Sequence, residues 1–346
     1  MAARPLNILK LKSLDPLERG HQHGETLREQ IKEIAEIRLE RTCALSPFKR
    51  VKDVLALAEE HVPLLQDYDQ SLFLEFRGIA EASNISMALL VVLNHYTDLR
   101  DISPKSLGHD PGGCSIIFSP TANGPILAQT WDIHGSAEPY VILLQFQDSV
   151  LFSIAGCLGM TGLNTHGVAI AINNLSSIDA KVGVVWPALI RKALTKNTAR
   201  DARDEILAAP LGSGRHFALA DDHDFFSIEA SGTKKKLVWD KASELYFHTN
   251  HCLDTEMRKT HVVSKESTSY YRYQQLDDVI RHQDLSAAEK VFVALAGVGL
   301  KKDPLDPHKT ATCGALVMNI NKRFVMGCQG IPDEAILASR DTRINL

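Results

Sequence analysis

The character of the chain changes abruptly around the stretch Asp110–Phe118, and this change limits the folds that are open to it. Before the stretch, apolar residues recur at helical spacing among charged ones. After it, short apolar runs alternate with turn residues at hairpin spacing. At the junction, Gly112 and Gly113 precede Cys114, which opens the first apolar run. We therefore expect a helical segment followed by a sheet-rich segment, with a glycine hinge between them.

The pattern predicts several helices on each side of the first strands. The Asn123-Gly124 pair between two apolar runs is the strongest hairpin signal in the chain. The expected helices are 25–41, 51–68, 72–82, 86–99, 187–194, 198–208, 270–281 and 287–296. The expected strands are 115–119, 125–131, 140–147, 150–156, 160–163, 168–172, 216–220, 225–229, 236–239, 245–248, 311–320 and 323–328.

Hairpin spacing predicts sheets that are mostly antiparallel. Several strands, such as 140–144, are apolar on both faces, so both faces must be covered. Two stacked sheets with helices outside satisfy this, which predicts an α+β fold, a four-layer αββα sandwich. We expect a helical N-terminal segment, 1–113, and a sheet-rich segment, 114–346, to form one folded domain.

Charge and cysteine usage exclude several classes of protein. The net charge of −4 gives no reason to expect nucleic acid or an anionic membrane surface as a partner. The start of the chain resembles no signal peptide, and its apolar runs are too short to span a bilayer. The six cysteines are scattered without Cys-x-x-Cys spacing, which argues against a zinc site or a disulfide framework. We expect free thiols, a cytoplasmic protein and no cofactor or metal.

Cys114 is the first candidate for chemistry. The glycines before it tolerate strained backbone, so its thiol is well placed to attack the preceding peptide bond. Cleavage there would leave an N-terminal cysteine that carries a nucleophile and a base on one residue. The alternative is a buried cysteine that merely opens a strand.

Two further candidates lie at strand ends. Asp132 follows strand 125–131, so the hairpin returns it to the end where Cys114 starts. A carboxylate there could orient the cysteine's amino group or exchange a proton with it, or it could cap a turn. Asn250 follows strand 245–248, and its amide could donate to a developing oxyanion. Asn173 and Asn174 could supply a second donor or satisfy turn backbone.

The histidines give only weak support for a metal site. His248 and His251 flank Asn250 without a clear third ligand. His21 and His23 lie between two glycines before helix 25–41, where we expect a loop without a metal.

Taken together and in their order along the chain, these residues resemble the motifs of a known enzyme family. The chain resembles the acyl-coenzyme A:6-aminopenicillanate acyltransferase family (isopenicillin N acyltransferase-like), within the N-terminal nucleophile hydrolases. The matching stretches keep the family's order over residues 20–330. They are Gly20-His21-Gln22-His23-Gly24, Gly113-Cys114, Gln129-Thr130-Trp131-Asp132, Leu163-Asn164-Thr165-His166-Gly167-Val168-Ala169, His248-Thr249-Asn250-His251 and Thr312-Cys313-Gly314-Ala315.

The resemblance implies an αββα fold of the N-terminal nucleophile hydrolase type and self-cleavage between Gly113 and Cys114. Residues 1–113 and 114–346 would then become the alpha and beta chains. It implies Cys114 as nucleophile, Asn250 as oxyanion donor and Asp132 near the amino group. The expected substrate is a small amide or N-acyl compound. Whether the chain forms a homo-oligomer stays open.

The chain departs from the family at Thr312-Cys313, where the penicillin enzyme has a Ser-Arg pair, so penicillin substrates are not implied. Thr312 stays a substrate candidate. Arg272 resembles a family position, with its role open between substrate contact and ion pair. The pocket is expected to combine residues before Cys114 with the loop 212–215.

Three alternatives stay open. The acyl-enzyme could pass its acyl group to an amine instead of water, with an acyl-CoA or amide donor. An uncleaved thiol hydrolase could use His134, His166 or His251 as base. A non-catalytic relative could only bind a ligand.

Overall fold

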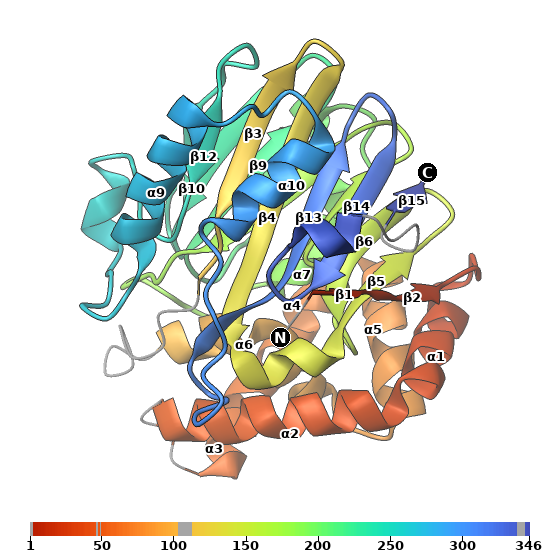
Figure 1. Cartoon of the computed structure of the whole chain (residues 1–346). Coiled ribbons are helices and arrows are strands. Elements are labelled where there is room, and N and C mark those ends of the chain that lie inside the picture. The colour runs from red at the N-terminus through yellow and green to blue at the C-terminus, as the bar shows by residue number, and fades with distance from the viewer. Residues whose placement is uncertain (1–2, 46–47, 49, 103–112, 338–342) are drawn as a thin grey trace.

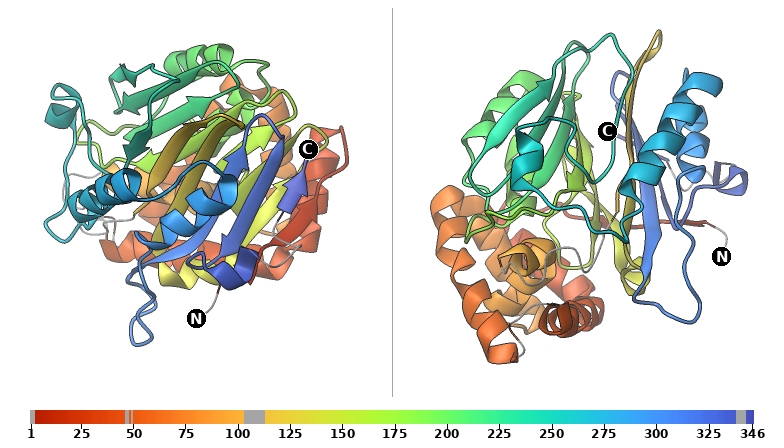
Figure 2. Two further views of the ribbon diagram at one scale, coloured as in Figure 1. Left: turned by 45° about the horizontal axis from the view of Figure 1, so that its top comes forward. Right: turned by 90° about the vertical axis from the view of Figure 1, so that its left-hand side faces the viewer.

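The computed structural model describes residues 3–45, 48, 50–102, 113–337 and 343–346. Two sheets stack face to face at the centre of the molecule (Figure 1; Figure 2, right). Helices cover the outer face of each sheet, and further helices gather below them. The predicted four-layer αββα sandwich is confirmed.

The first sheet carries the hairpin that follows Cys114. Within the described residues it has seven strands in the order β1-β14-β13-β4-β3-β12, with β15 paired to β14. All of its pairs are antiparallel. The strands are β1 (Arg4–Pro5), β3 (Ile116–Thr121), β4 (Gly124–His134), β12 (Tyr246–His248), β13 (Thr310–Asn319), β14 (Phe324–Gln329) and β15 (Arg343–Asn345).

The second sheet has eight strands in the described residues, in the order β11-β10-β9-β8-β7-β6-β5-β2. The pair β2–β5 is parallel and the others are antiparallel. The strands are β2 (Asn7–Lys10), β5 (Val141–Gln145), β6 (Ser149–Ile154), β7 (Thr161–Asn164), β8 (Ala169–Asn174), β9 (Arg215–Ala220), β10 (Phe225–Ala230) and β11 (Lys235–Trp239).

The helices fall into three groups. The N-terminal group lies at the bottom of Figure 1, α7 and α8 pack beside the second sheet, and α9 and α10 cover the first. They are α1 (Pro16–Thr26), α2 (Arg28–Leu45), α3 (Val51–Glu59), α4 (His61–Tyr68), α5 (Gln70–Ser83), α6 (Met87–Asp101), α7 (Trp186–Ala193), α8 (Ala199–Ala208), α9 (Ser269–His282), α10 (Ala288–Ala296), the short α11 (Glu334–Leu337), and the 3-10 helices η2 (Gly135–Tyr140) and η3 (Met257–Thr260).

Apolar side chains fill the space between the layers. The rings of Phe118 and Phe225, one from each sheet, stack with centroids 4.1 Å apart in the central layer. A second cluster, including Ile117 and Phe292, lies between the first sheet and α10. Strands such as β6 are therefore apolar on both faces because both faces are covered.

The N-terminal segment contributes to both sheets as well as to the helices. β1 pairs with β14, and β2 pairs with β5. These contacts tie the first residues to the sheet-rich segment without relying on the peptide bond before Cys114. The division at residue 113 into two chains stays a prediction, and the predicted loop 103–112 lies outside the described residues.

One expectation about the N-terminal region is wrong. His21 and His23 lie within α1 and not in a loop. Gly20 and Gly24 allow this helix to approach α5 closely, since a Cβ at Gly20 would lie 2.1 Å from the Glu75 carbonyl oxygen. The two glycines therefore serve helix packing.

No single helix in the described ranges is long and apolar enough to cross a membrane. Taken together, α5 and α6 have sufficient length and apolar composition, but the two helices are bent by 115° at their junction.

Candidate active site

The β3–β4 hairpin sets the position of Cys114. The turn at Asn123-Gly124 forms as expected, with Gly124 at a φ of +99° that favours glycine. From this turn the strands pair back to an isolated antiparallel bridge between Gly113 and Asp132. The hairpin register thus brings Asp132 beside the Gly113–Cys114 peptide, as the sequence predicts.

Both sides of the Gly113–Cys114 peptide are held by hydrogen bonds. The backbone N–H of Asp132 donates to the Gly113 carbonyl oxygen at 2.7 Å. The N–H of Cys114 donates to Oδ1 of Asn250 at 2.8 Å. On the next peptide, the Cys114 carbonyl oxygen accepts from Asn173 Nδ2 at 2.9 Å and from Arg272 Nη1 at 2.8 Å. The atoms around this bond therefore have fixed positions.

Asn250 is anchored just beyond the end of β12. Its backbone N–H donates to Ser269 Oγ at 2.8 Å, and its side-chain Nδ2 donates to the Asn174 carbonyl oxygen at 2.9 Å. Its Oδ1 also accepts from Arg272 Nη2 at 2.8 Å. In this structure Asn250 therefore faces Cys114 as an acceptor. An amide nitrogen carries two protons, which leaves one for a further acceptor; the oxyanion-donor role stays a prediction.

Asp132 is buried among groups that favour its charged form. Thr312 Oγ1 donates to its Oδ1 at 2.7 Å, and Arg272 Nη1 lies 4.0 Å from its Oδ2. Burial nevertheless raises the pKa of Asp132 above its usual value, although Arg272, Thr312 and Thr130 oppose the rise. Thr312 also accepts from the Leu300 N–H at 2.8 Å, which fixes its hydroxyl.

The thiol of Cys114 is almost fully buried, with 4% of the residue exposed. Burial, with the nearby Asp132 charge, raises the pKa of this thiol to about 12. Arg272 and Arg215 partly oppose this rise. In the uncleaved chain the thiol therefore keeps its proton at neutral pH, and any attack by sulfur needs a base.

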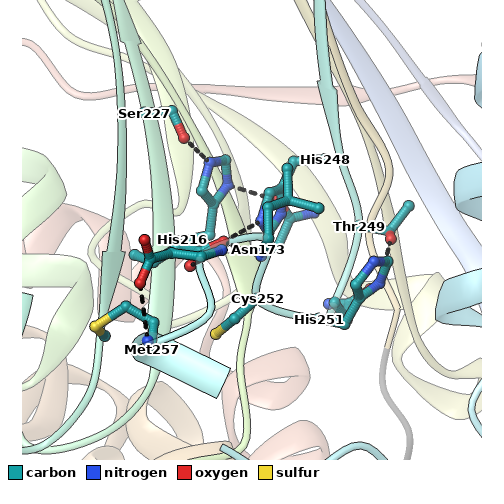
Figure 3. Close-up of polar contacts among 12 residues, drawn as sticks. Asn173, His216, Ser227, His248, Thr249, His251, Cys252 and Met257 are labelled. Atoms are coloured by element: carbon teal, nitrogen blue, oxygen red, sulfur yellow. Dashed lines mark hydrogen bonds and ion pairs between the residues drawn. The ribbon is translucent and has the colours of Figure 1, made fainter. Parts of the chain in front are cut away.

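A buried polar network lies behind Asn173 (Figure 3). Its Oδ1 meets Nδ1 of His216 at 2.7 Å and Nδ1 of His248 at 2.9 Å, and the two rings stack with centroids 3.6 Å apart. His216 Nε2 meets Ser227 Oγ at 2.8 Å, and His248 Nε2 meets Glu229 Oε1 at 3.2 Å.

Donor and acceptor capacities fix the protons in this network. The Cys114 carbonyl can only accept, so Nδ2 of Asn173 must face it, and Oδ1 must accept from both rings. Burial lowers the pKa of His216 well below its usual value, so its Nε2 accepts from Ser227.

Glu229 anchors the far side of this network. Its carboxyl oxygens accept the backbone N–H groups of Leu253 and Asp254, and Oε1 also meets Nε2 of His248 at 3.2 Å. Through His248 these contacts hold the Asn173 side chain with its amide nitrogen toward Cys114.

The pocket at this site has a free volume of about 40 Å³. Its lining combines residues before Cys114 with Arg215, as the sequence predicts. The lining residues are Arg38, Asn94, Tyr96, Thr97, Gly113, Cys114, Trp131, Asp132, Ile133, Met160, Ile172, Asn174, Trp186 and Arg215. This space holds a few water molecules, far less than a typical ligand pocket.

The structure brings all the predicted site residues around one peptide. These are Cys114, Asp132 and Asn250, the substrate candidates Asn173, Arg272 and Thr312, and the cleavage-site residue Gly113. Sequence reasoning missed Arg38, His216 and Glu229. For the last two, the available signal was a polar residue within a mostly apolar strand.

Metal-ligating groups are sparse in the part of the chain that the structure describes. No three His, Cys, Asp or Glu side chains lie close enough together there to hold an ion. Nδ1 of His251 is hydrogen-bonded to Ser269 Oγ at 2.8 Å. Cys114, Cys157, Cys252, Cys313 and Cys328 are free thiols, as expected.

Comparison with known proteins identifies the family. The model of the acyl-coenzyme A:6-aminopenicillanic acid acyl-transferase family matches residues 120–304, more than half of the chain. The chain belongs to this family. The protein is therefore an enzyme of the acyl-transfer and amide-hydrolysis class, which acts on C–N bonds.

One curated relative and two solved structures illustrate the likeness. The 40 kDa form of acyl-coenzyme A:6-aminopenicillanic-acid-acyltransferase from Emericella nidulans is 24% identical over 253 residues, which cover 69% of this chain and 67% of that protein. The Caenorhabditis elegans ortholog of N-acylethanolamine-hydrolyzing acid amidase is 14% identical, with a TM-score of 0.44, over 67% of this chain and all of that one. The C2A mutant of conjugated bile acid hydrolase from Clostridium perfringens is 10% identical, with a TM-score of 0.43, over 62% of this chain and 89% of that one. The substrates in these names belong to those proteins.

Proposed function

We propose that this acyltransferase-family protein is a self-processing cysteine amidohydrolase. The precursor cleaves itself between Gly113 and Cys114, and the new N-terminal cysteine then hydrolyses a small amide or N-acyl substrate through a thioester. One observation carries the proposal: the Gly113 carbonyl oxygen accepts the Asp132 N–H at 2.7 Å, so a donor already faces the oxygen that becomes negative on attack.

Processing begins with the Cys114 thiol. Because its pKa is about 12, very little thiolate is present at neutral pH. Asp132, whose pKa burial raises, takes the thiol proton as sulfur attacks the Gly113 carbonyl carbon. The oxyanion then forms at the hydrogen bond from the Asp132 N–H.

Collapse of this intermediate breaks the bond between the Gly113 carbon and the Cys114 nitrogen. Asp132 returns the proton to that nitrogen, and a thioester joins the Gly113 carbonyl to the Cys114 sulfur. Water hydrolyses the thioester and leaves a carboxylate on Gly113, a free thiol and a free amino group. Gly113 lines the pocket, so withdrawal of the new chain end enlarges it.

Turnover uses the new amino group as base. A free α-amino group has a pKa of about 7.7–8.0, which suits transfer of the thiol proton to the leaving amine. Asn250 and Asn173 lie on the two sides of Cys114 and are the side-chain donors for the substrate oxyanion. No cofactor takes part in these steps.

Acyl transfer is the second candidate function, because the matching family model and the curated relative are acyltransferases. Up to the thioester the chemistry is identical, and the two differ only in whether water or an amine resolves it. Incubation of an acylated enzyme with candidate amines separates them.

The contacts around Cys114 disfavour the alternative in which a histidine acts as the base for its thiol in an uncleaved hydrolase. Among the described residues, no histidine is hydrogen-bonded to this cysteine, and His134, one of the three candidate bases, contacts Ser136 Oγ at 2.7 Å. The buried free thiols also suit a reducing compartment, so we propose a cytoplasmic location.

The proposal is tested by intact mass under denaturing conditions together with turnover of small amides. Wild-type protein should give two chains, one ending at Gly113 and one beginning at Cys114. Cys114→Ala should give one full-length, inactive chain, because the nucleophile for both reactions is absent.

Cys328→Ala is the matched control, since Cys328 is a buried thiol in the cluster beneath α10 and not in the pocket. It should still cleave. Finding the Cys114→Ala chain cut after Gly113 would disprove self-processing by this thiol.

A further inference from the structure

The pocket beside Cys114 holds more positive charge than the described residues neutralise. Its walls include Trp131 and Trp186, and two buried arginines, Arg38 and Arg215, line it. Each arginine has a buried Nε that finds no hydrogen-bond partner among the described residues. A buried donor without an acceptor is costly, so each such nitrogen points to a group that the described residues do not supply.

Arg38 is the more unusual of the two. It lies on α2 with 4% of its surface exposed, and its guanidinium carbon is 5.4 Å from the centre of the Tyr96 ring and 6.0 Å from that of Trp131. Its Nη1 donates to the Leu93 carbonyl oxygen. No carboxylate among the described residues lies within ion-pair distance of it.

In the part of the chain that the structure describes, the neighbouring charges are paired, which leaves the charge of Arg38 without a counter-charge there. Arg215 forms an ion pair with Asp98 and donates to Asn174 Oδ1 at 2.8 Å. Asp132, the carboxylate of the pocket, lies 4.0 Å from Arg272. An uncompensated buried charge is strongly unfavourable, so its retention in a pocket is the mark of a ligand site.

We propose that Arg38 binds a carboxylate of the substrate. The planar guanidinium presents several N–H donors to a carboxylate, and one excess positive charge matches one negative charge. The substrate is then an amide with a carboxylate on one side of the scissile bond and an apolar portion against Trp131 and Trp186. This inference rests on the proposed function, because it places the substrate of Cys114 in this pocket.

The experiment compares matched probes that differ only in charge. N-hexanoylglycine and N-hexanoylglycinamide place the carboxylate, or its neutral counterpart, on the amine side. The anilide of adipic acid and that of its monoamide place it on the acyl side. The readouts are kcat/KM for each probe and the shift in Tm that each probe produces, which needs no turnover.

Wild-type protein should prefer the charged member of at least one pair, and that pair identifies the side that carries the carboxylate. In Arg38→Met the ratio of kcat/KM for charged over neutral probe should fall about 10- to 100-fold, as expected for loss of a charged hydrogen bond. Arg38→Lys should lose less, because it keeps the charge. Arg28→Met, on the exposed start of the same helix, is the matched control and should keep the wild-type ratio.

The outcomes separate this inference from the proposed function. Two results would overturn the carboxylate site. One is an Arg38→Met variant whose ratio of kcat/KM for charged over neutral probe equals that of the wild type. The other is a wild-type protein that shows no preference for the charged probe in either pair. If Arg38→Met does not fold, the wild-type comparison still decides. If the chain neither cleaves itself nor turns over an amide, but charged probes still raise Tm through Arg38, the site stands and the proposed function falls.

Discussion

Thr312→Val tests the proposal that Asp132 is the base for self-cleavage. The Thr312 hydroxyl donates to Asp132 Oδ1 at 2.7 Å, and valine keeps its shape without the donor. A hydrogen bond to a charged group contributes about 1.5–3 kcal/mol, and one pKa unit corresponds to about 1.4 kcal/mol. Loss of this donor disfavours the carboxylate, so the pKa of Asp132 should rise by about one to two units above its already raised value.

Self-cleavage requires the charged form of Asp132, so the rate falls at low pH. In Thr312→Val this fall should move about one to two pH units upward. The assay is the time course of the two chains by intact mass between about pH 4 and 9, after synthesis of the precursor in a cell-free system. Thr312→Ser keeps the hydroxyl and should follow the wild type.

The same substitution also removes the acceptor for the Leu300 N–H, which costs about 1–3 kcal/mol of stability. Urea unfolding must therefore show that Thr312→Val is folded throughout the pH range. A folded variant whose cleavage falls at the wild-type pH would refute Asp132 as the base.

Three further results are expected. Asn250→Ala should reduce turnover roughly 10²–10³-fold while leaving the protein folded by circular dichroism; intact turnover would remove Asn250 from the mechanism. Gly113→Ala should slow cleavage in the mass assay, because its Cβ would lie 3.1 Å from the side chains of Asp132 and Arg272; a wild-type rate would show that the peptide shifts freely. Burial lowers the pKa of His23 from 6.5 to about 4, so the folded protein binds this proton less readily than the unfolded chain. Stability from this group is full above about pH 6.5 and is lost as the pH falls toward 4, by ~3 kcal/mol. In urea titrations, His23→Gln should depend less on pH over this range; an equal slope would contradict the assignment.

The sequence could predict those parts of the site that local pairing determines. The Asn123-Gly124 turn sets the register of β3 and β4, so the position of Asp132 beside Cys114 follows from counting along a hairpin. Thr312 lies 180 residues from Asp132, and no periodicity connects them. A bulge in the β13–β4 pairing after Thr312 sets that contact, and only the family resemblance indicated the residue.

Local propensity failed where packing decided the outcome. Two glycines around His21 and His23 lower helix propensity, so the sequence favoured a loop. The contact of α1 with α5 overrides this preference, because glycine allows an approach that any Cβ would block. Similarly, the expected helix 51–68 is two helices, α3 and α4, that break at Glu60. Arg38 could not be recognised, because a helical arginine is normally solvated and its burial depends on the sheets above it.

In the proposed enzyme, one set of contacts serves both processing and turnover. Before cleavage, Asn250 Oδ1 accepts the peptide N–H of Cys114 and also a donor from Arg272. After cleavage, the amino group of Cys114 inherits this place. It then lies between two charged neighbours of opposite effect, Arg272, which disfavours its protonated form, and the carboxyl of Asp132, which favours it. The base that must accept the thiol proton would therefore be held where the uncleaved peptide N–H now lies.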